Sequence, residues 1–114
     1  MTIINSSKKF TAKETYAMTK NATITKMTAH KGEIFEVRDW CLYEDVDRNG
    51  EVREILSIMT AEGDVIATNS DTFKREFMDM VDMFAAAGEP LAPIAVVSGT
   101  AKSGREFITC ALAD

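Results

Sequence analysis

Few residues of this 114-residue chain have types and spacings that could support catalysis or bind a metal ion. His30 is the only histidine, so neither a nucleophile–histidine pair nor a multi-histidine metal site can be assembled. The segment Asp45-x-Asp47-x-Asn49-Gly50 is similar to the first half of a calcium-binding loop. Its twelfth position is Leu56, where a bidentate glutamate is required, so the segment is more typical of a hairpin turn. The sequence therefore predicts no catalytic residue, no metal site, no cofactor and no enzyme.

Aromatic and basic side chains indicate a different chemistry, because the bases of a single nucleic-acid strand stack on aromatic rings while lysine and arginine hold its phosphates. The candidate residues are Trp40, Tyr43, Arg48, Arg53, Lys102, Arg105 and Phe107. Phe107 alternates with the apolar Ile108 and Cys110, so its ring is expected to point outward. Trp40 and Tyr43 lie on opposite faces of an apolar stretch, and at least one of them is expected in the core.

The elements that must position these residues follow from apolar patterns and turn signals. Residues 33–46 are typical of a long strand with a bulge or bend near Asp39, where the alternation changes and the strand turns to serve two surfaces. Shorter strands are predicted at 52–58, 65–68, 91–98 and 107–112, with Pro93 placing its strand at an edge or delaying its start. A helix should begin after Asn69 and Ser70 and end at Gly88 and Pro90. Its apolar stripe consists of Phe73, Phe77, Met80, Val81 and Phe84. A helical turn at 12–21 and a strand at 22–27 are weaker expectations.

Three strands, one helix and two strands form the order of a five-stranded OB barrel, whose helix lies between strands 3 and 4. The fold class predicted here is therefore mainly β, an OB-like barrel of order β-β-β-α-β-β preceded by a basic N-terminal arm. The alternative is an open α+β sheet with the helix on one face. In the barrel, Arg48 lies in loop 1-2 and Lys102 and Arg105 in loop 4-5, the loops that bracket the binding groove.

Charge is distributed unevenly along the chain. The net charge is −5, but residues 1–31 carry six lysines and one glutamate, for +5, whereas residues 32–114 carry seven basic and seventeen acidic side chains, for −10. We therefore expect a partly ordered basic arm (1–31) and a folded domain (32–114). A basic arm can suit an anionic partner, since contact depends on the local field, although a solvated terminus would have the same composition.

The cysteines and the hydropathy pattern indicate the cellular compartment in which the protein acts. Cys41 and Cys110 each lie in an apolar run without metal-ligand spacing, so both are expected to be reduced and buried. No apolar stretch is long enough for a membrane helix, and no signal peptide is indicated. We expect a protein of the cytoplasm with no membrane partner.

Several segments also resemble a known family. They are Gly32-Glu-Ile-Phe-Glu-Val, Asp39-Trp-x-Leu-Tyr-Glu-Asp-Val, Glu54-Ile-Leu-Ser-Ile, Val65-Ile-Ala-Thr-Asn-Ser and Ser98-Gly-Thr-Ala-Lys-Ser-Gly-Arg-Glu-Phe-Ile-Thr. The chain resembles the small single-stranded DNA-binding proteins of tailed phages of Gram-positive bacteria over residues 32–112. Ala67-Thr-Asn-Ser and Ser103-Gly-Arg-Glu-Phe are the most specific pieces. The resemblance implies an OB-like fold and sequence-independent binding of exposed DNA strands during phage replication.

The function expected is thus non-catalytic binding of single-stranded DNA, in phage DNA replication or recombination inside the bacterial host. Replication proteins and further copies of the chain are additional candidate partners. Two alternatives stay open: an acidic inhibitor that imitates DNA, and an OB-like scaffold module. Acidic residues clustered on the groove would favour the inhibitor, whereas acids on the helix and turns form a solvated surface.

Overall fold

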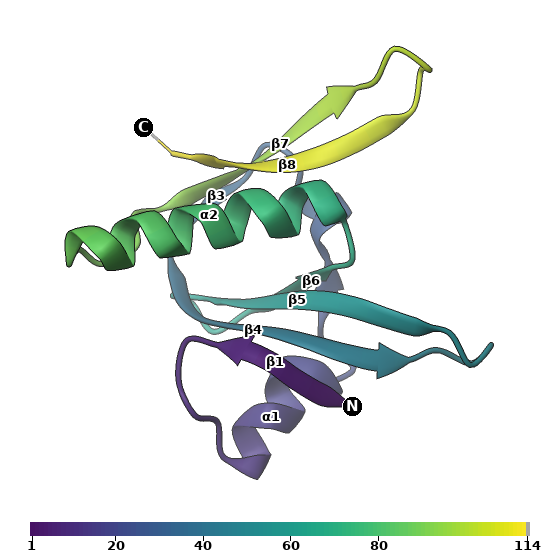
Figure 1. The fold of residues 1–114 in the computed structure, drawn as a ribbon, viewed down its shortest axis with the longest axis vertical. Coiled ribbons are helices and arrows are strands. Elements are labelled where there is room, and N and C mark those ends of the chain that lie inside the picture. The colour runs from purple at the N-terminus through teal and green to yellow at the C-terminus, as the bar shows by residue number, and fades with distance from the viewer. Residues whose placement is uncertain (114) are drawn as a thin grey trace.

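The computed structural model describes residues 1–113 as two β-sheets and two α-helices (Figure 1). In chain order the elements are β1 (Thr2–Ser6), α1 (Ala12–Thr19), β2 (Thr25–Lys26), the 3₁₀ helix η1 (Met27–His30), β3 (Ile34–Phe35), β4 (Val37–Val46), β5 (Val52–Thr60), β6 (Val65–Thr68), α2 (Asp71–Ala87), β7 (Ile94–Thr100) and β8 (Glu106–Leu112). One sheet has the order β1-β4-β5-β6-β2, and the other has the order β3-β7-β8. The mainly β class is confirmed.

The long first strand of the predicted barrel bends as expected. It is divided at Glu36 into β3 and β4, and the pairing of β4 with β5 shifts register between Val37 and Asp39. β3 pairs with β7 in the smaller sheet, whereas β4 pairs with β5 in the larger one. The bend therefore allows one continuous segment to serve both sheets.

The β4–β5 turn uses its acidic side chain to support the backbone. Asp47 Oδ1 accepts hydrogen bonds from the amides of Asn49 (2.8 Å) and Glu51 (3.1 Å). Gly50 adopts a φ of +82°, which a side chain would disfavour. This loop is a hairpin turn, and residues 1–113 contain no group of three or more His, Cys, Asp or Glu placed to hold a metal ion.

Helix α2 lies between the two sheets (Figure 1). Ser70 caps it by accepting from the Phe73 amide (3.2 Å), and Gly88, at a φ of +71°, ends it. Phe73 and Phe77 are fully buried in the main core, which joins β4, β5 and β6 to β7 and β8. The predicted helix and its apolar face are confirmed.

The predicted closed five-stranded barrel with a single helix is not what the structure shows. In the described part of the chain, β6 does not pair with β8, and the two sheets remain separate. The edge of β6 that barrel closure would require is occupied by β2, which pairs with it in parallel through Thr25–Ile66 and Lys26–Ala67. The chain thus has an OB-like strand order without a closed barrel, and α1 is a second α-helix.

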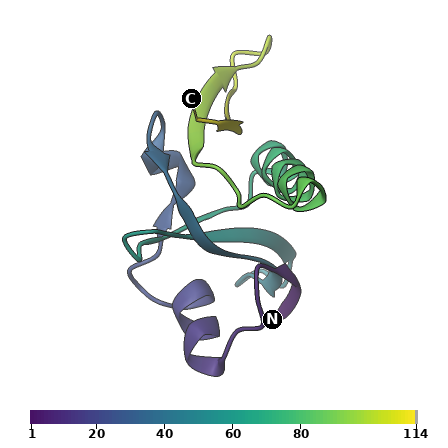
Figure 2. The same ribbon diagram turned by 90° about the vertical axis from the view of Figure 1, so that its left-hand side faces the viewer.

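The N-terminal segment, expected to be a partly ordered arm, forms β1, α1, β2 and η1 and is packed onto the larger sheet. β1 pairs antiparallel with β4, and α1 begins with a capping box in which Thr11 and Glu14 bond each other's backbone amides. Figure 2 shows the larger sheet lying between α1 and α2. Residue 31 still marks the change in charge, but the segment before it belongs to the larger sheet. No α-helix within residues 1–113 has the length and hydropathy needed to cross a membrane.

Candidate nucleic-acid interface

Two adjoining hollows open near the N-terminal end of α2. The first, of about 430 Å³, lies between β2, β5 and β6. The second, of about 590 Å³, lies between the start of α2 and the β7–β8 hairpin. Thr28 and Asn69 line both hollows, so the two hollows are adjacent, and together they make up the groove.

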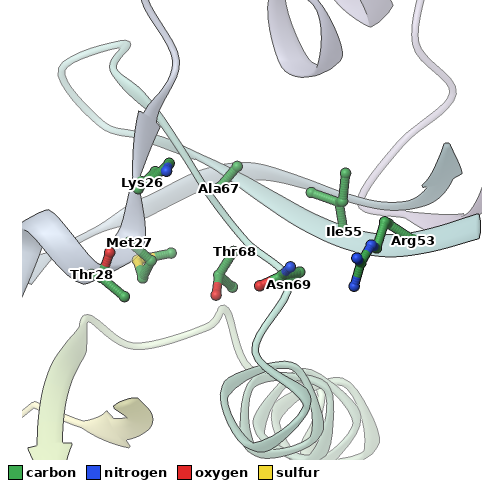
Figure 3. Close-up of a pocket in the computed structure, with 8 residues that line it drawn as sticks. All are labelled: Lys26, Met27, Thr28, Arg53, Ile55, Ala67, Thr68 and Asn69. Atoms are coloured by element: carbon green, nitrogen blue, oxygen red, sulfur yellow. The ribbon is translucent and has the colours of Figure 1, made fainter. Parts of the chain in front are cut away.

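The first hollow combines an apolar lining with two cations. Figure 3 shows Lys26 on the β2 side, Arg53 and Ile55 on the β5 side, and Ala67 of β6 between them. Met27 is fully buried and closes the hollow toward the core. A nucleic-acid strand bound in this hollow would meet positive charge from two different segments of the protein.

Arg53 is held in place by carboxylates of its own hairpin. Its Nε lies 3.1 Å from Asp47 Oδ2, and its Nη2 lies 3.1 Å from Glu51 Oε2. Backbone hydrogen bonds from Glu51 and Asn49, together with Arg53, hold the pKa of the Asp47 carboxyl below its usual value. Asp47 therefore remains charged at neutral pH and positions the guanidinium, which has further donors to offer.

The second hollow presents an aromatic ring beside a basic turn. Phe107 on β8 is 39% exposed and pairs with Gly99 on β7. A Cβ placed on Gly99 would lie 2.6 Å from Cζ and 2.9 Å from Cε2 of Phe107, so the ring lies directly against the glycine backbone. Arg105 follows the β7–β8 turn and lines the same hollow. The hairpin thus supports one face of an exposed ring next to a cation, an arrangement suited to a stacked base and its phosphate.

The charges lining the groove are mostly basic, and its acids are paired. Lys26, Arg53 and Arg105 line it together with Asp71 and Glu106. Asp71 lies 3.1 Å from the Lys74 ammonium, and Glu106 lies 3.2 Å from that of Lys31. The lining side chains themselves thus comprise three basic and two acidic groups, and of the three cations Arg53 is also paired, with Asp47 and Glu51.

Lys74 fixes the start of α2 against β5. It is buried, and its Nζ donates to the Glu54 carbonyl oxygen (3.0 Å) while contacting the carboxylates of Glu54 (3.3 Å) and Asp71 (3.1 Å). A buried ammonium persists only when it is paired in this way. The link holds the 69–72 segment, which forms the junction between the two hollows.

Three of the predicted site residues line the groove: Arg53, Arg105 and Phe107. Arg48 and Lys102 are exposed on the β4–β5 and β7–β8 turns, outside the residues that line either hollow.

The prediction that Trp40 or Tyr43 stacks bases is wrong, because both side chains are buried. Trp40 is 7% exposed and makes an edge-on contact with Phe77, at 6.0 Å between ring centroids. Tyr43 is 3% exposed on the opposite face, in a cluster with Met18 of α1 and Cys41. Burial, aided by the nearby Asp45, raises the pKa of Tyr43 to about 12. The N-terminal segment covers this outer face of the larger sheet through Met18 of α1.

Both cysteines are buried and free within the described residues, as expected. Burial raises the pKa of the Cys41 thiol to about 11 and that of Cys110 to about 12. Both thiols therefore stay protonated at neutral pH and pack as small apolar groups.

Sequence reasoning missed Lys26, Thr28 and Asn69 as groove residues. Lys26 and Thr28 come from β2 and η1, in the segment that was expected to form an arm. Asn69 was considered only as a helix cap. A usable signal was nevertheless present, because Ala67-Thr-Asn-Ser and Ser103-Gly-Arg-Glu-Phe, the two most specific pieces of the family resemblance, both contribute to the groove.

An OB-like strand order together with a basic groove and an exposed ring is typical of proteins that bind single-stranded nucleic acid. The model of the family described as Phage Single-stranded DNA-binding protein, of the Phi29 type, matches residues 14–113. The chain belongs to this family, and the resemblance noted in the sequence is confirmed. The match also includes β2 and η1, which form one wall of the groove. No curated protein and no solved structure gave a match.

Proposed function

We propose that the chain binds single-stranded DNA in the groove, without sequence preference, and protects exposed strands during phage DNA replication or recombination in the bacterial host. The observation that carries the proposal is the adjacency of the two hollows, which share Thr28 and Asn69, with Arg53 lining one and Arg105 and Phe107 lining the other. Family membership supports the choice of ligand.

The side chains have separate roles in this proposal. Phe107 stacks on a base, and since every base has a π-face, this contact tolerates any sequence. Lys26, Arg53 and Arg105 contact phosphates, while Arg48 and Lys102 attract the strand where it leaves the groove. These contacts position the DNA and carry no sequence information.

The distribution of acids supports DNA binding over DNA mimicry. The described acids of the groove, Asp71 and Glu106, each lie beside a lysine. Other carboxylates lie on exposed or half-exposed positions of α2, such as Glu76, Asp79 and Asp82. An inhibitor that imitates a DNA backbone would instead require unpaired acids along the groove.

Fluorescence anisotropy of labelled oligo-dT at low salt tests the proposal. Phe107→Ala should weaken binding about 5- to 150-fold, since stacking on one base is worth about 1–3 kcal/mol. Arg105→Ala should weaken it and reduce the salt dependence. Tyr16→Ala, which removes an exposed ring on α1, and Arg75→Ala, on α2, are matched controls that should bind as the unmodified protein does.

Two results would contradict the proposal. One is the absence of a binding signal at high micromolar protein. The other is unchanged affinity in both Phe107→Ala and Arg105→Ala while the unmodified protein binds, which would place the DNA elsewhere on the surface.

A further inference from the structure

The first hollow has a chemistry that phosphate contacts alone do not explain. Ile55 and Ala67 give it an apolar lining, and Thr68 and Asn69 add polar groups at one edge. Its volume of about 430 Å³ falls within the range of about 300–1,000 Å³ typical of small-ligand pockets. None of its lining residues is aromatic. It is therefore an open hollow in which a base can rest against aliphatic side chains, and it offers no aromatic surface for stacking.

Asn69 provides the hydrogen-bonding group of this hollow. Among residues 1–113 its side-chain amide is engaged in no hydrogen bond, although its backbone is fixed directly before the α2 cap Ser70. An asparagine amide carries both a donor and an acceptor, so by rotation it can match the edge of any base. A hydrogen bond from Asn69 would hold a base without selecting a sequence.

Two cations line the hollow from different segments, as binding of a nucleotide with its phosphates requires. Lys26 reaches it from β2 and Arg53 from β5 (Figure 3). A phosphate on either side of the base would therefore meet a positive charge. The neighbouring hollow, joined through Thr28 and Asn69, contains the Phe107 ring.

We propose that this hollow is a base-insertion pocket: it accepts one nucleobase of the bound strand, turned away from its neighbours, against Ile55 and Ala67 and beside the Asn69 amide. The inference rests on the proposed function and adds a second mode of base recognition to it. One base stacks on Phe107, and another packs in the first hollow without stacking on a ring. The ligand class of the pocket is any nucleobase within a single strand.

The test is to fill the pocket. Ala67→Leu adds three carbons to its lining, and Ala67→Ser leaves its volume nearly unchanged. Ala86→Leu, an exposed position of α2 outside the groove, is the matched control for the added apolar group. Circular dichroism and thermal melting establish that each variant is folded. Each is titrated with labelled oligo-dT and with an all-abasic oligonucleotide of the same length.

Ala67→Leu should weaken oligo-dT binding about 2- to 13-fold, the order expected for losing one net hydrogen bond to a base, and leave binding of the abasic strand unchanged. Ala67→Ser and Ala86→Leu should bind both strands as the unmodified protein does, and Asn69→Ala should weaken oligo-dT binding selectively. In a Phe107→Ala background the effect of Ala67→Leu should persist, because the two bases are held separately.

If folded Ala67→Leu and the unmodified protein bind oligo-dT with equal affinity, the proposal of a base-insertion pocket is overturned. Equal weakening for oligo-dT and the abasic strand would also overturn it, since the substitution would then act on the backbone path. Either result, combined with a loss of binding in Phe107→Ala, leaves the proposed function intact. A failure of the unmodified protein to bind oligo-dT refutes both proposals.

Discussion

Replacing Glu51 by glutamine should strengthen DNA binding, because Glu51 competes with DNA for Arg53. The Arg53 Nη2 lies 3.1 Å from Glu51 Oε2, and the two side chains are 49% and 66% exposed. A phosphate that approaches the groove can displace this carboxylate. Asp47, which accepts from two turn amides in addition to binding Arg53 Nε, stays in place. Glu51→Gln removes the competing charge and retains the backbone hydrogen bonds of Glu51.

The expected magnitude follows from the exposure of the pair. An exposed ion pair contributes about 0.2–1 kcal/mol, so its removal should raise the affinity about 1.4- to 5-fold. Salt dependence gives a second readout. In the unmodified protein, Glu51 freed from Arg53 attracts a cation from solution. This uptake offsets one of the cations that the DNA phosphate releases on binding, so the net number of released cations is smaller. The log–log salt slope of Glu51→Gln should therefore steepen by up to about 0.7.

The assay is anisotropy with oligo-dT across a series of salt concentrations. Glu62→Gln on the β5–β6 turn is the matched control, since it makes the same charge change at an exposed position outside the groove. Screening limits the reach of that charge to about 8–10 Å at ordinary ionic strength. If Glu51→Gln and Glu62→Gln give the same affinity and the same slope, Glu51 does not compete with DNA, and the reasoning is refuted.

Three further predictions concern the ring, the core and α1. Gly99→Ala should push the Phe107 ring from its position and lower oligo-dT affinity toward that of Phe107→Ala; unchanged affinity in a folded variant would contradict this role of the glycine. Ser57→Ala should raise the free energy of unfolding by about 1 kcal/mol in denaturant titrations, because the buried Ser57 hydroxyl has no hydrogen-bond partner among the described residues; a loss of stability would count against it. The hydrogen bond from Lys8, followed by that from the Thr11 amide, lowers the pKa of Glu14 from 4.5 to about 2. This carboxylate therefore favours the folded α1 above pH 4.5, and the contribution is lost as the pH falls from 4.5 toward 2; an NMR titration midpoint near 4.5 would show that the Lys8 and Thr11 contacts do not form.

The features that could be predicted are those set by local sequence. The stripe of Phe73 and Phe77 and the flanking Ser70 and Gly88 define α2 within a single segment. The bend near Asp39 was visible as a change in alternation, and the outward position of Phe107 followed from its buried neighbour Ile108.

The features that could not be predicted depend on pairing between distant segments. β1 is exposed and partly polar, and its partner β4 lies more than thirty residues away. β2 has only two residues, yet it occupies the edge of β6 that would close a barrel. Their positions are set by which sheet edges remain unpaired, and neither strand has an apolar alternation of its own.

Trp40 and Tyr43 show how a correct pattern led to a wrong prediction. The stretch from Trp40 to Tyr43 is apolar on both faces, which is typical of a strand covered on both sides. From this pattern the sequence predicts only that at least one of the two rings lies in the core, because it does not show what covers each face of the strand. The structure places α1 over Tyr43 and α2 against Trp40, so both faces are buried.

The position of the groove explains how a chain with a net charge of −5 can attract DNA. Its cations come from both sides of the charge boundary at residue 31: Lys26 belongs to the +5 segment, and Arg53 and Arg105 belong to the −10 segment. The pairing of β2 with β6 brings Lys26 to the hollow that Arg53 also lines. In the proposed site the basic N-terminal segment therefore forms one wall rather than a separate arm. Detaching β2 from β6 should weaken binding by more than the loss of one lysine charge, because the β2 side of the first hollow would be lost with it.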